Sequence, residues 1–466
     1  MFGDLSGASR EATVSVTFRG SGHRVAAIRV PGPDERVRHV AMEHKLFSPQ
    51  GPGRVYCDDG PSRPFATDAS KFALFSAACA AYIAGMEQRP DVVHLHDWHS
   101  ALYLLLREFD PEREALRSIR TVFTIHNLAL QGIRPIAGDE SSLASWFPAL
   151  AYDRSTAGDP RYTDCINPMA VAIRLSDRLN TVSPRYAAEI LRPNNAAHGF
   201  HGGEGLQADL QQAKRQGRLF GILNGCVYPK RDRRRPGWRS LLETVAREVD
   251  AWRSHDETRA DHHESALQRL ATLPKRRPRH LLVSIGRITD QKVALFLQPT
   301  SAGATALEAI LQGPAAGGVL IMLGSGDPQL ERQLAGISRD RDNFLFLCGF
   351  AQTFSEMLYK AGDLFLMPST FEPCGISQML AMRAGQPCVA HAVGGLRDTI
   401  RDMVDGFTFS GDTPTAQAES FVEAVRHALA VRTDDPDRWL RIREGAAAAR
   451  FTWDASAMQY IGEMYE

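Results

Sequence analysis

The stretch DLFLMPSTFEPCGISQMLAMRAGQPCVAH, residues 363–391, contains two short apolar runs separated by a Pro/Gly-rich turn and a helical segment. Continuous apolar runs of this length are typical of parallel strands that helices cover on both faces. One carboxylate, Glu372, lies in the turn, directly before a stretch that must be buried. The stretch therefore predicts a strand, a helix and a second parallel strand, with Glu372 near the carboxyl end of the first strand.

The same alternation of apolar runs and helical patterns extends in both directions along the chain. Further strands are predicted at residues 91–97, 121–126, 178–183, 219–224, 280–287, 318–325 and 343–350. They fall into two groups separated by residues 230–280, a charged segment without a strand pattern. The sequence therefore predicts an α/β protein with two parallel sheets joined by a polar connector.

The composition argues against several classes of protein. Lys plus Arg and Asp plus Glu number 54 each, so the formal net charge is zero and no long-range field favours nucleic acid or a membrane. We interpret the basic clusters of the connector as a solvated linker and helix face. Seven cysteines without a C-x-x-C pair indicate reduced thiols and a cytoplasmic protein. We find neither a signal-peptide pattern nor a membrane-spanning apolar run.

Polar side chains follow most of the predicted strands, at the edge where parallel sheets bind ligands. In the first half they include Asp97 and the histidines of HLHDWH, then His126, then Asn224. A histidine at the end of a buried strand is more often a hydrogen-bond partner of the backbone than a catalyst. A metal site at HLHDWH is not favoured, because the two rings of an H-x-H strand face one way while Asp97 and His99 begin a turn and helix.

The second half contains a pattern that suits a phosphorylated ligand. Arg287 and Lys292, in GRITDQK, follow one strand within about one turn of each other. A diphosphate would receive paired contacts from the Arg and a point charge from the Lys, whereas a surface salt bridge is the alternative. The helix starts at FEPCG and at VGGLRDTI, residues 393–400, offer N–H groups to anions. Glu372 would then accept hydrogen bonds from sugar hydroxyls.

Several motifs, taken in order, resemble those of the bacterial glycogen synthase and plant starch synthase family. The second half has G-R-x-T-x-Q-K, E-P-C-G and G-G-L-x-D-T, and the first has VVHLHDWHSAL, FTIHNLALQG, RLNTVSPRYAAEIL, GGEGL and GILNG. This resemblance, from about residue 35 to the end, implies the GT-B fold, in which two Rossmann-like domains face a central cleft. It implies domains at residues 1–235 and 279–450, a connector at 236–278, and a terminal helix at 451–466 that crosses back to the first domain.

The resemblance also implies a reaction and a site. The enzyme would be a retaining glycosyltransferase that moves glucose from ADP-glucose, or alternatively UDP-glucose, to the 4-hydroxyl of an α-1,4-glucan such as glycogen. Glu372 would contact the donor glucose, and Arg287 and Lys292 would stabilise the departing diphosphate. That diphosphate would accept the proton, so no protein base is expected, and because Arg287, Lys292 and the helix starts would stabilise its charge, no metal or other cofactor is expected either. The remaining implied site residues are His126 beside the transferred glucose, Asp97 and Asn224 along the cleft, Phe350 stacking on the nucleobase, and Cys374, Gly375, Gly394, Gly395 and Leu396 as substrate contacts.

One feature of the family is missing. No Lys-x-Gly-Gly-Leu loop occurs in the chain, and RGSG at residues 19–22 is a weak substitute. The first domain is therefore expected to lack about one β-α unit, with an exposed sheet edge. This keeps open the alternative of a catalytically impaired homologue that binds glucan or nucleotide. A phosphorylase is not favoured, since no lysine can be nominated to carry its pyridoxal group.

Overall fold

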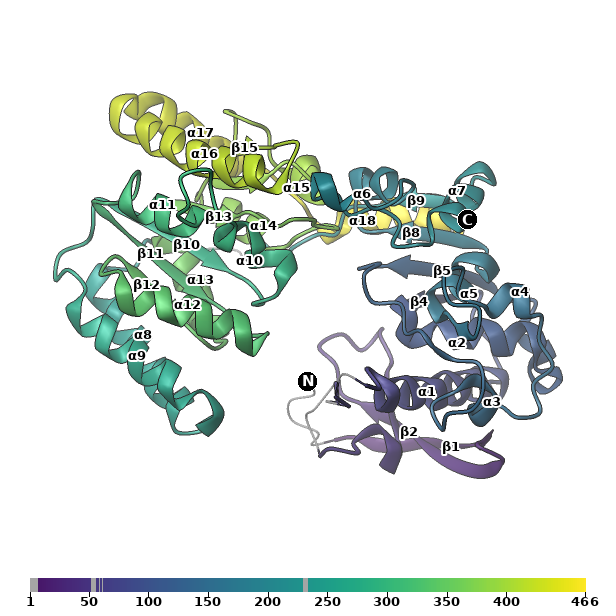
Figure 1. Cartoon of the computed structure of the whole chain (residues 1–466). Coiled ribbons are helices and arrows are strands. Elements are labelled where there is room, and N and C mark those ends of the chain that lie inside the picture. Colours follow the sequence, from purple (N-terminus) through teal and green to yellow (C-terminus); the bar gives the residue numbers. More distant parts are fainter. Residues whose placement is uncertain (1–6, 52–55, 58, 61, 229–233) are drawn as a thin grey trace.

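The computed structural model describes residues 7–51, 56–57, 59–60, 62–228 and 234–466. These residues form two α/β lobes, purple to teal and green to yellow in Figure 1. Each lobe contains one parallel sheet, as the sequence predicts. Every apolar run predicted to be a strand coincides with one, and in most of them, such as residues 318–323 and 364–367, the side chains are buried on both faces.

The first lobe is built on a four-stranded parallel sheet in the order β4-β5-β8-β9. Its strands are β4 (Val92–His96), β5 (Arg120–Ile125), β8 (Arg178–Thr181) and β9 (Leu219–Gly221). The helices of this lobe include α1 (Ala66–Ala84), α2 (Asp97–Phe109), α5 (Pro168–Leu175), α6 (Pro184–Glu189) and α7 (Gln207–Arg215). Leu104 and Leu105 of α2 are fully buried in the core, together with Phe123 of β5.

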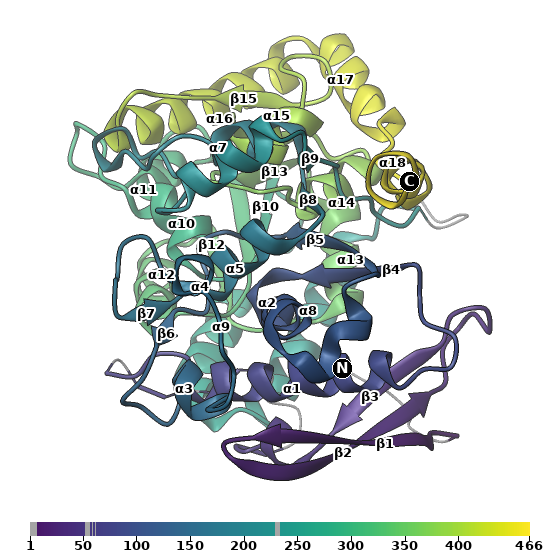
Figure 2. The ribbon, with the colours of Figure 1, turned by 90° about the vertical axis from the view of Figure 1, so that its right-hand side faces the viewer.

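An antiparallel sheet, which the sequence analysis did not predict, precedes the parallel one. The strand β1 (Ser9–Phe18) pairs with β2 (Ser21–Val30), which pairs with β3 (His39–Glu43). Figure 2 shows this sheet beside α1, and Phe18 shares the core with Leu74 of that helix. RGSG therefore does not replace a ligand-binding loop. It forms the hairpin turn, where Arg19 and Gly20 have φ angles of 53° and 70°.

The second lobe contains a six-stranded parallel sheet in the order β12-β11-β10-β13-β14-β15. The strands are β10 (His280–Ile285), β11 (Gly318–Leu323), β12 (Phe344–Leu347), β13 (Leu364–Met367), β14 (Cys388–His391) and β15 (Phe407–Phe409). Only β15 was not predicted. The strands β10 and β13 lie side by side, which brings the turn after each one to the same edge of the sheet.

Helices pack against both faces of this sheet. They are α10 (Asp290–Leu297), α11 (Ala306–Gln312), α12 (Pro328–Asp340), α13 (Gln352–Ala361), α14 (Ser377–Arg383), α15 (Gly394–Thr399), α16 (Pro414–Asp434) and α17 (Pro436–Ala448). The expected connector forms two more, α8 (Trp238–Arg253) and α9 (Ala260–Thr272). Leu241 and Val245 of α8 are buried in the same core as Val283 of β10, so this segment is charged only on its outer face. The domain boundaries drawn from the sequence stay a prediction.

Short elements complete the described residues. They are β6 (Arg134–Pro135), β7 (Cys165–Ile166), α3 (Leu143–Trp146), α4 (Arg154–Ala157), and 3-10 turns at Lys45–Phe47, Pro111–Leu116, Ala196–His198 and Glu257–Arg259. A search of the described helices finds none with the length and apolar character needed to cross a bilayer.

The C-terminal segment joins the two lobes. Helix α18 (Trp453–Tyr460) and the π-helical turn Ile461–Tyr465 leave the second lobe and run along the first, in yellow beside β8 and β9 in Figure 1. The Oγ of Ser456 donates to the carbonyl of Leu223 over 2.6 Å. The amide of Asn180 donates to the hydroxyl of Tyr460 over 2.7 Å. Met464 is fully buried against Val122 and Ile222.

Replacing Met464 by alanine should destabilise the protein by about 2–4 kcal/mol, because it leaves a cavity where the C-terminus meets the first-lobe sheet. Urea unfolding followed by tryptophan fluorescence measures this loss. Met458→Ala is the matched control, since Met458 is 69% exposed on the same segment and should change the midpoint little. Equal effects of the two variants would contradict the assigned packing.

Candidate active site between the lobes

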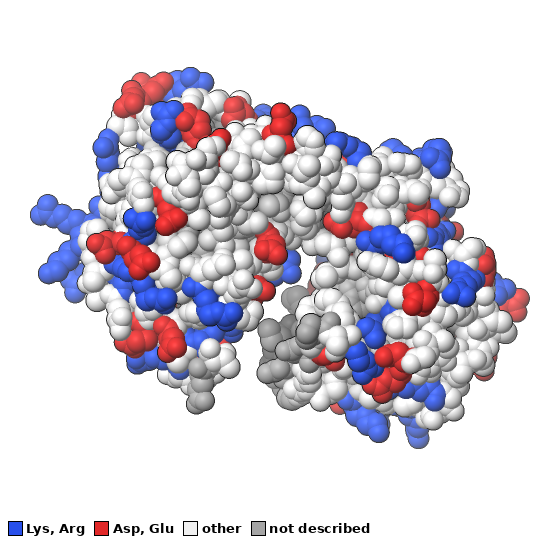
Figure 3. All heavy atoms as spheres, in the orientation of Figure 1, with Lys and Arg blue, Asp and Glu red and all other residues white. Residues whose placement is uncertain are grey.

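A cleft of about 1370 Å³ lies between the carboxyl ends of the two parallel sheets. Figure 3 shows the hollow between the lobes and a surface on which charges of both signs are mixed. Residues from both lobes line the cleft. Those predicted from the sequence are Asp97, His126, Asn224, Arg287, Lys292, Phe350, Glu372, Cys374 and Gly375.

Glu372 lies in the turn that follows β13 and is only 4% exposed. Its carboxylate accepts a hydrogen bond from Ser369 Oγ over 3.0 Å and forms an ion pair with the ammonium of Lys292. Gln291, next to that lysine, donates to the carbonyl of Phe371 over 3.0 Å. The GRITDQK segment therefore holds the turn of Glu372 through both side chains. A buried carboxylate requires such partners, because isolated burial of its charge is costly.

The two cations predicted to bind a diphosphate differ in their surroundings. The side chain of Lys292, on α10, is 18% exposed and paired with Glu372. Arg287 is exposed, and its guanidinium forms no hydrogen bond or ion pair with another described residue. The guanidinium is thus open to a ligand in the cleft, while the ammonium of Lys292 can bridge between an anion and Glu372.

His126 is placed by its backbone and by a second histidine. Its N–H donates to Asp97 Oδ1 over 2.8 Å, and its Nε2 lies 3.1 Å from Nδ1 of His96. Burial lowers the pKa of His126 below its ordinary value. The ring is therefore neutral at pH 7, which suits a hydrogen bond to a hydroxyl group rather than an ionic contact.

Asp97 begins α2 with a φ of 53°, a left-handed conformation that non-glycine residues seldom adopt. The carboxylate faces the backbone of the HNL segment, where it accepts from the N–H of His126. Burial raises the pKa of Asp97 to about 6, although the N–H bonds of His126 and Asn127 oppose this rise. Asp97 therefore fixes the position of His126 within the cleft.

Three other predicted residues meet the cleft in different ways. Phe350 is 74% exposed, so one face of its ring is available for stacking. Asn224 follows β9 on the opposite wall. Cys374 is buried, and burial raises the pKa of its thiol to about 12. A thiol that stays protonated is no nucleophile, in agreement with the interpretation of Cys374 as a small residue at a tight turn.

The predicted anion site at VGGLRDTI is occupied by protein groups. The carboxylate of Glu189, on α6, accepts from the N–H of Gly394 at 3.0 and 3.1 Å. The N–H of Gly395 donates to the carbonyl of Glu372 over 2.9 Å, and Leu396 is fully buried. These three residues do not line the cleft. In this structure Gly394 and Gly395 brace the turn that carries Glu372, and their contact with substrate, like that of Leu396, stays a prediction.

Sequence reasoning missed Arg383, Glu356 and Tyr56 of the cleft, and it did not give His99 its partner. Arg383 of α14 forms an ion pair with Glu356 of α13 over 2.6 Å. The hydroxyl of Tyr56 lies 3.1 Å from Nε2 of His99. No local pattern indicates either pair, because the partners are distant in the chain and meet only after folding.

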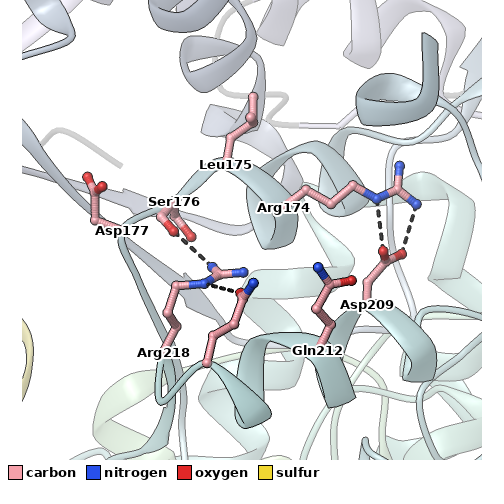
Figure 4. A pocket seen from close by; sticks show the side chains of 8 residues that line it. Arg174, Leu175, Ser176, Asp177, Asp209, Gln212 and Arg218 are labelled. Atoms are coloured by element: carbon pink, nitrogen blue, oxygen red, sulfur yellow. Dashed lines mark hydrogen bonds and ion pairs between the residues drawn. The ribbon is translucent and has the colours of Figure 1, made fainter. Parts of the chain in front are cut away.

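A second hollow, of about 420 Å³, lies on the first lobe (Figure 4). The arginines that line it have hydrogen-bond acceptors within the protein. Arg174 contacts both carboxylate oxygens of Asp209, at 3.0 and 2.8 Å, and Arg218 donates to the carbonyl of Ser176 over 2.9 Å. We interpret this hollow as structural, since no cation in it lacks an acceptor.

Comparisons with known proteins find relatives along most of the chain. A family model described as the starch synthase catalytic domain matches residues 5–212, and one described as glycosyl transferases group 1 matches residues 279–430. A glycogen synthase of Streptococcus gordonii is 33% identical over 417 residues, covering 86% of this chain and 78% of the relative. A glycogen synthase of Anaeromyxobacter sp. strain Fw109-5 is 34% identical over 437 residues, covering 91% and 82%.

Solved structures are similar as well. The catalytic domain of starch synthase IV from Arabidopsis thaliana, bound to ADP and acarbose, is 26% identical, with a TM-score of 0.74 over 98% of this chain and 87% of its own. The sucrose-phosphate synthase of Thermosynechococcus elongatus, at 20% identity and a TM-score of 0.51, covers 90% of this chain and 86% of its own. This second likeness concerns the fold alone.

Asp97→Asn should change how stability depends on pH. The folded-state pKa of about 6 lies above the ordinary value of 3.8, so the stabilising contribution is complete below about pH 4 and lost as the pH rises through 6. An asparagine keeps an acceptor for His126 without the charge. The unfolding free energy of Asp97→Asn relative to the unmodified chain should therefore rise by about 2 kcal/mol between pH 4 and 7.

Urea unfolding at a series of pH values measures this difference. Asp153→Asn is the control, because a hydrogen bond from Ser155 lowers the pKa of Asp153. The unfolding free energy of this variant relative to the unmodified chain should therefore fall, not rise, as the pH increases. A pH-independent difference for Asp97→Asn would show that the carboxyl is not titrating in this range.

Proposed function

This chain belongs to the family of glycogen and starch synthases, which are glycosyltransferases of the GT-B fold, and from this premise we propose the substrates and residues of its reaction. The donor is ADP-glucose, and the acceptor is the non-reducing 4-hydroxyl end of an α-1,4-glucan. A related starch synthase bound to ADP and acarbose supports this choice over UDP-glucose. The odd number of cysteines, without a C-x-x-C pair, favours the cytoplasm as the place of the reaction.

One observation carries the proposal. Arg287, Lys292, Glu372 and His126 come from different segments of two lobes and line the same cleft. A protein that only bound glucan would not need two cations beside a buried acid. Nothing in the arrangement favours the catalytically impaired alternative.

The proposed reaction begins as the bond between glucose and the diphosphate loosens toward an oxocarbenium-like state. Arg287 and Lys292 stabilise the negative charge that develops on the departing diphosphate. Lys292 keeps contact with Glu372, so the carboxylate moves little when the anion enters. Glu372 accepts hydrogen bonds from the donor glucose and offers negative charge near its developing cation.

The acceptor 4-hydroxyl then attacks from the face that the diphosphate is leaving, so the α-configuration is retained. The diphosphate takes the proton of that hydroxyl, and no protein base is required. His126, neutral and fixed by Asp97, is placed for hydrogen bonding to the transferred glucose. Phe350 offers its exposed ring to the nucleobase.

The proposal is tested by the transfer of radiolabelled glucose into glycogen, with ADP-glucose and UDP-glucose compared at equal concentration. We expect incorporation from ADP-glucose to exceed that from UDP-glucose. Binding of glycogen without incorporation from either donor would replace the synthase assignment with a glucan-binding role. The reverse preference would correct only the nucleotide.

Glu372→Gln should lower kcat by about a thousandfold or more, because the neutral amide removes charge stabilisation at the reacting carbon. The affinity for ADP should change little, since the cations remain. Arg287→Ala should reduce both turnover and ADP affinity. Glu444→Gln, an exposed position on α17, is the control. If Glu372→Gln kept most of the activity, the role of this acid would be wrong.

A further inference from the structure

A third hollow, of about 450 Å³, lies at the end of the second-lobe sheet opposite the cleft. It is found where β10 and β13 begin, beside the corner between α16 and α17. Its lining consists of Arg235, Arg279, Asp363, Arg432, Thr433, Trp439 and Arg443. We call it the arginine hollow.

A single carboxylate lies at the base of the arginine hollow. Asp363, 5% exposed, accepts from Arg235 at 2.5 Å and from Arg277 at 2.9 Å, and it lies 3.2 Å from Arg432. The contact with Arg432 is an ion pair without a hydrogen bond, whereas Asp363 also accepts from the N–H of Leu281 at 2.9 Å. Although burial acts to raise it, the pKa of Asp363 is lowered by Arg432 and Arg235. The carboxylate therefore stays charged, but its acceptor capacity is used.

Two further guanidinium groups have no acidic partner among the described residues. Arg279 forms no side-chain hydrogen bond there, and Arg443 donates only through Nε, to the carbonyl of Gly385 over 3.1 Å. Five guanidinium groups thus surround one carboxylate, an excess of four positive charges. Burial lowers the pKa of Arg432 and of Arg443, and neighbouring arginines lower it further.

The contrast with the hollow of Figure 4 shows why this excess matters. In that first-lobe hollow each guanidinium has a carboxylate or carbonyl acceptor. In the arginine hollow, cations repel one another in a partly desolvated space, where charge interactions are stronger than in water. A bound anion would relieve the repulsion and satisfy the terminal nitrogens of Arg279 and Arg443.

We propose that the arginine hollow binds a phosphate dianion, either free phosphate or the terminal phosphate of a small metabolite. Guanidinium groups form paired hydrogen bonds with phosphate oxygens, and several of them converge here. The volume lies in the range of small-molecule sites, so the phosphate can carry an organic group. The site is separate from the proposed diphosphate contacts of Arg287 and Lys292, which lie at the other end of β10.

The test measures binding of inorganic phosphate by calorimetry at constant ionic strength. The whole chain carries Arg287→Gln, Lys292→Gln and Glu372→Gln throughout, so that phosphate cannot bind to the two cations proposed to contact the diphosphate and no buried carboxylate loses its partner. We expect binding to persist in this background. Adding Arg279→Gln and Arg443→Gln should weaken it at least about tenfold, because two charge-assisted contacts are lost.

The matched control adds Arg438→Gln and Arg441→Gln, which remove the same charge from exposed positions of α17 outside the hollow. This control should leave the affinity within about twofold. The proposal is overturned if phosphate does not bind, if Arg279→Gln with Arg443→Gln leaves binding unchanged, or if the control weakens it equally. Arg279→Gln alone, at an exposed side chain, should weaken binding at least about threefold if the double change impairs folding.

A second ligand distinguishes the two sources of phosphate. Glycerol 3-phosphate is titrated under the same conditions. Tighter binding of this monoester than of inorganic phosphate identifies a phosphorylated metabolite as the occupant, and the reverse identifies free phosphate. Since Arg287 and Lys292 are replaced in these variants, the result does not depend on whether the proposed transferase activity is correct.

Discussion

The ion pair between Glu372 and Lys292 is the constraint on which the cleft depends. A carboxylate that is nearly buried needs a cation and hydrogen-bond donors, or its charge would be neutralised. The chain supplies them from adjacent strands, since Lys292 follows β10 and Glu372 follows β13. The parallel pairing of these strands is therefore what makes the site possible. Gln291, next to Lys292, donates a hydrogen bond to the carbonyl of Phe371 in the same turn and so helps to hold that turn in place.

The first lobe holds this turn as well. Ser183, before α6, donates to the carbonyl of Pro373 over 2.6 Å, and Glu189, at the end of α6, accepts from Gly394. A side chain at Gly394 would collide with the carbonyl of Glu372, since a Cβ there would lie 1.9 Å from that oxygen. The glycines of VGGLRDTI thus permit close approach of the backbone at Glu372 and Cys374. These two contacts join α6 of the first lobe to the turn of the second lobe that carries Glu372.

The sequence predicted the two sheets because their strands are continuously apolar, and a run such as LFLM can only be buried. It missed β15, whose three residues, Phe407–Phe409, are too few to form a pattern. It assigned the residues of α8 to a polar connector. The many charged residues of this segment make its apolar stripe at helical spacing, which includes Leu241 and Val245, hard to recognise. The cleft residues were predicted where they directly follow a strand. The pairing of Glu189 with Gly394 was not, because 205 residues separate them and only the folded chain brings them together.

A formal net charge of zero says little about local fields. Positive charge is concentrated at both ends of β10: Arg287 and Lys292 lie beyond its carboxyl end, and the arginine hollow surrounds its first residue. The acids that balance the total form ion pairs elsewhere, such as Asp209 with Arg174. At the cleft, one cation is balanced by Glu372 and the other is open to a ligand. At the arginine hollow, one aspartate faces five arginines, so an external anion is the partner that electrostatics requires there.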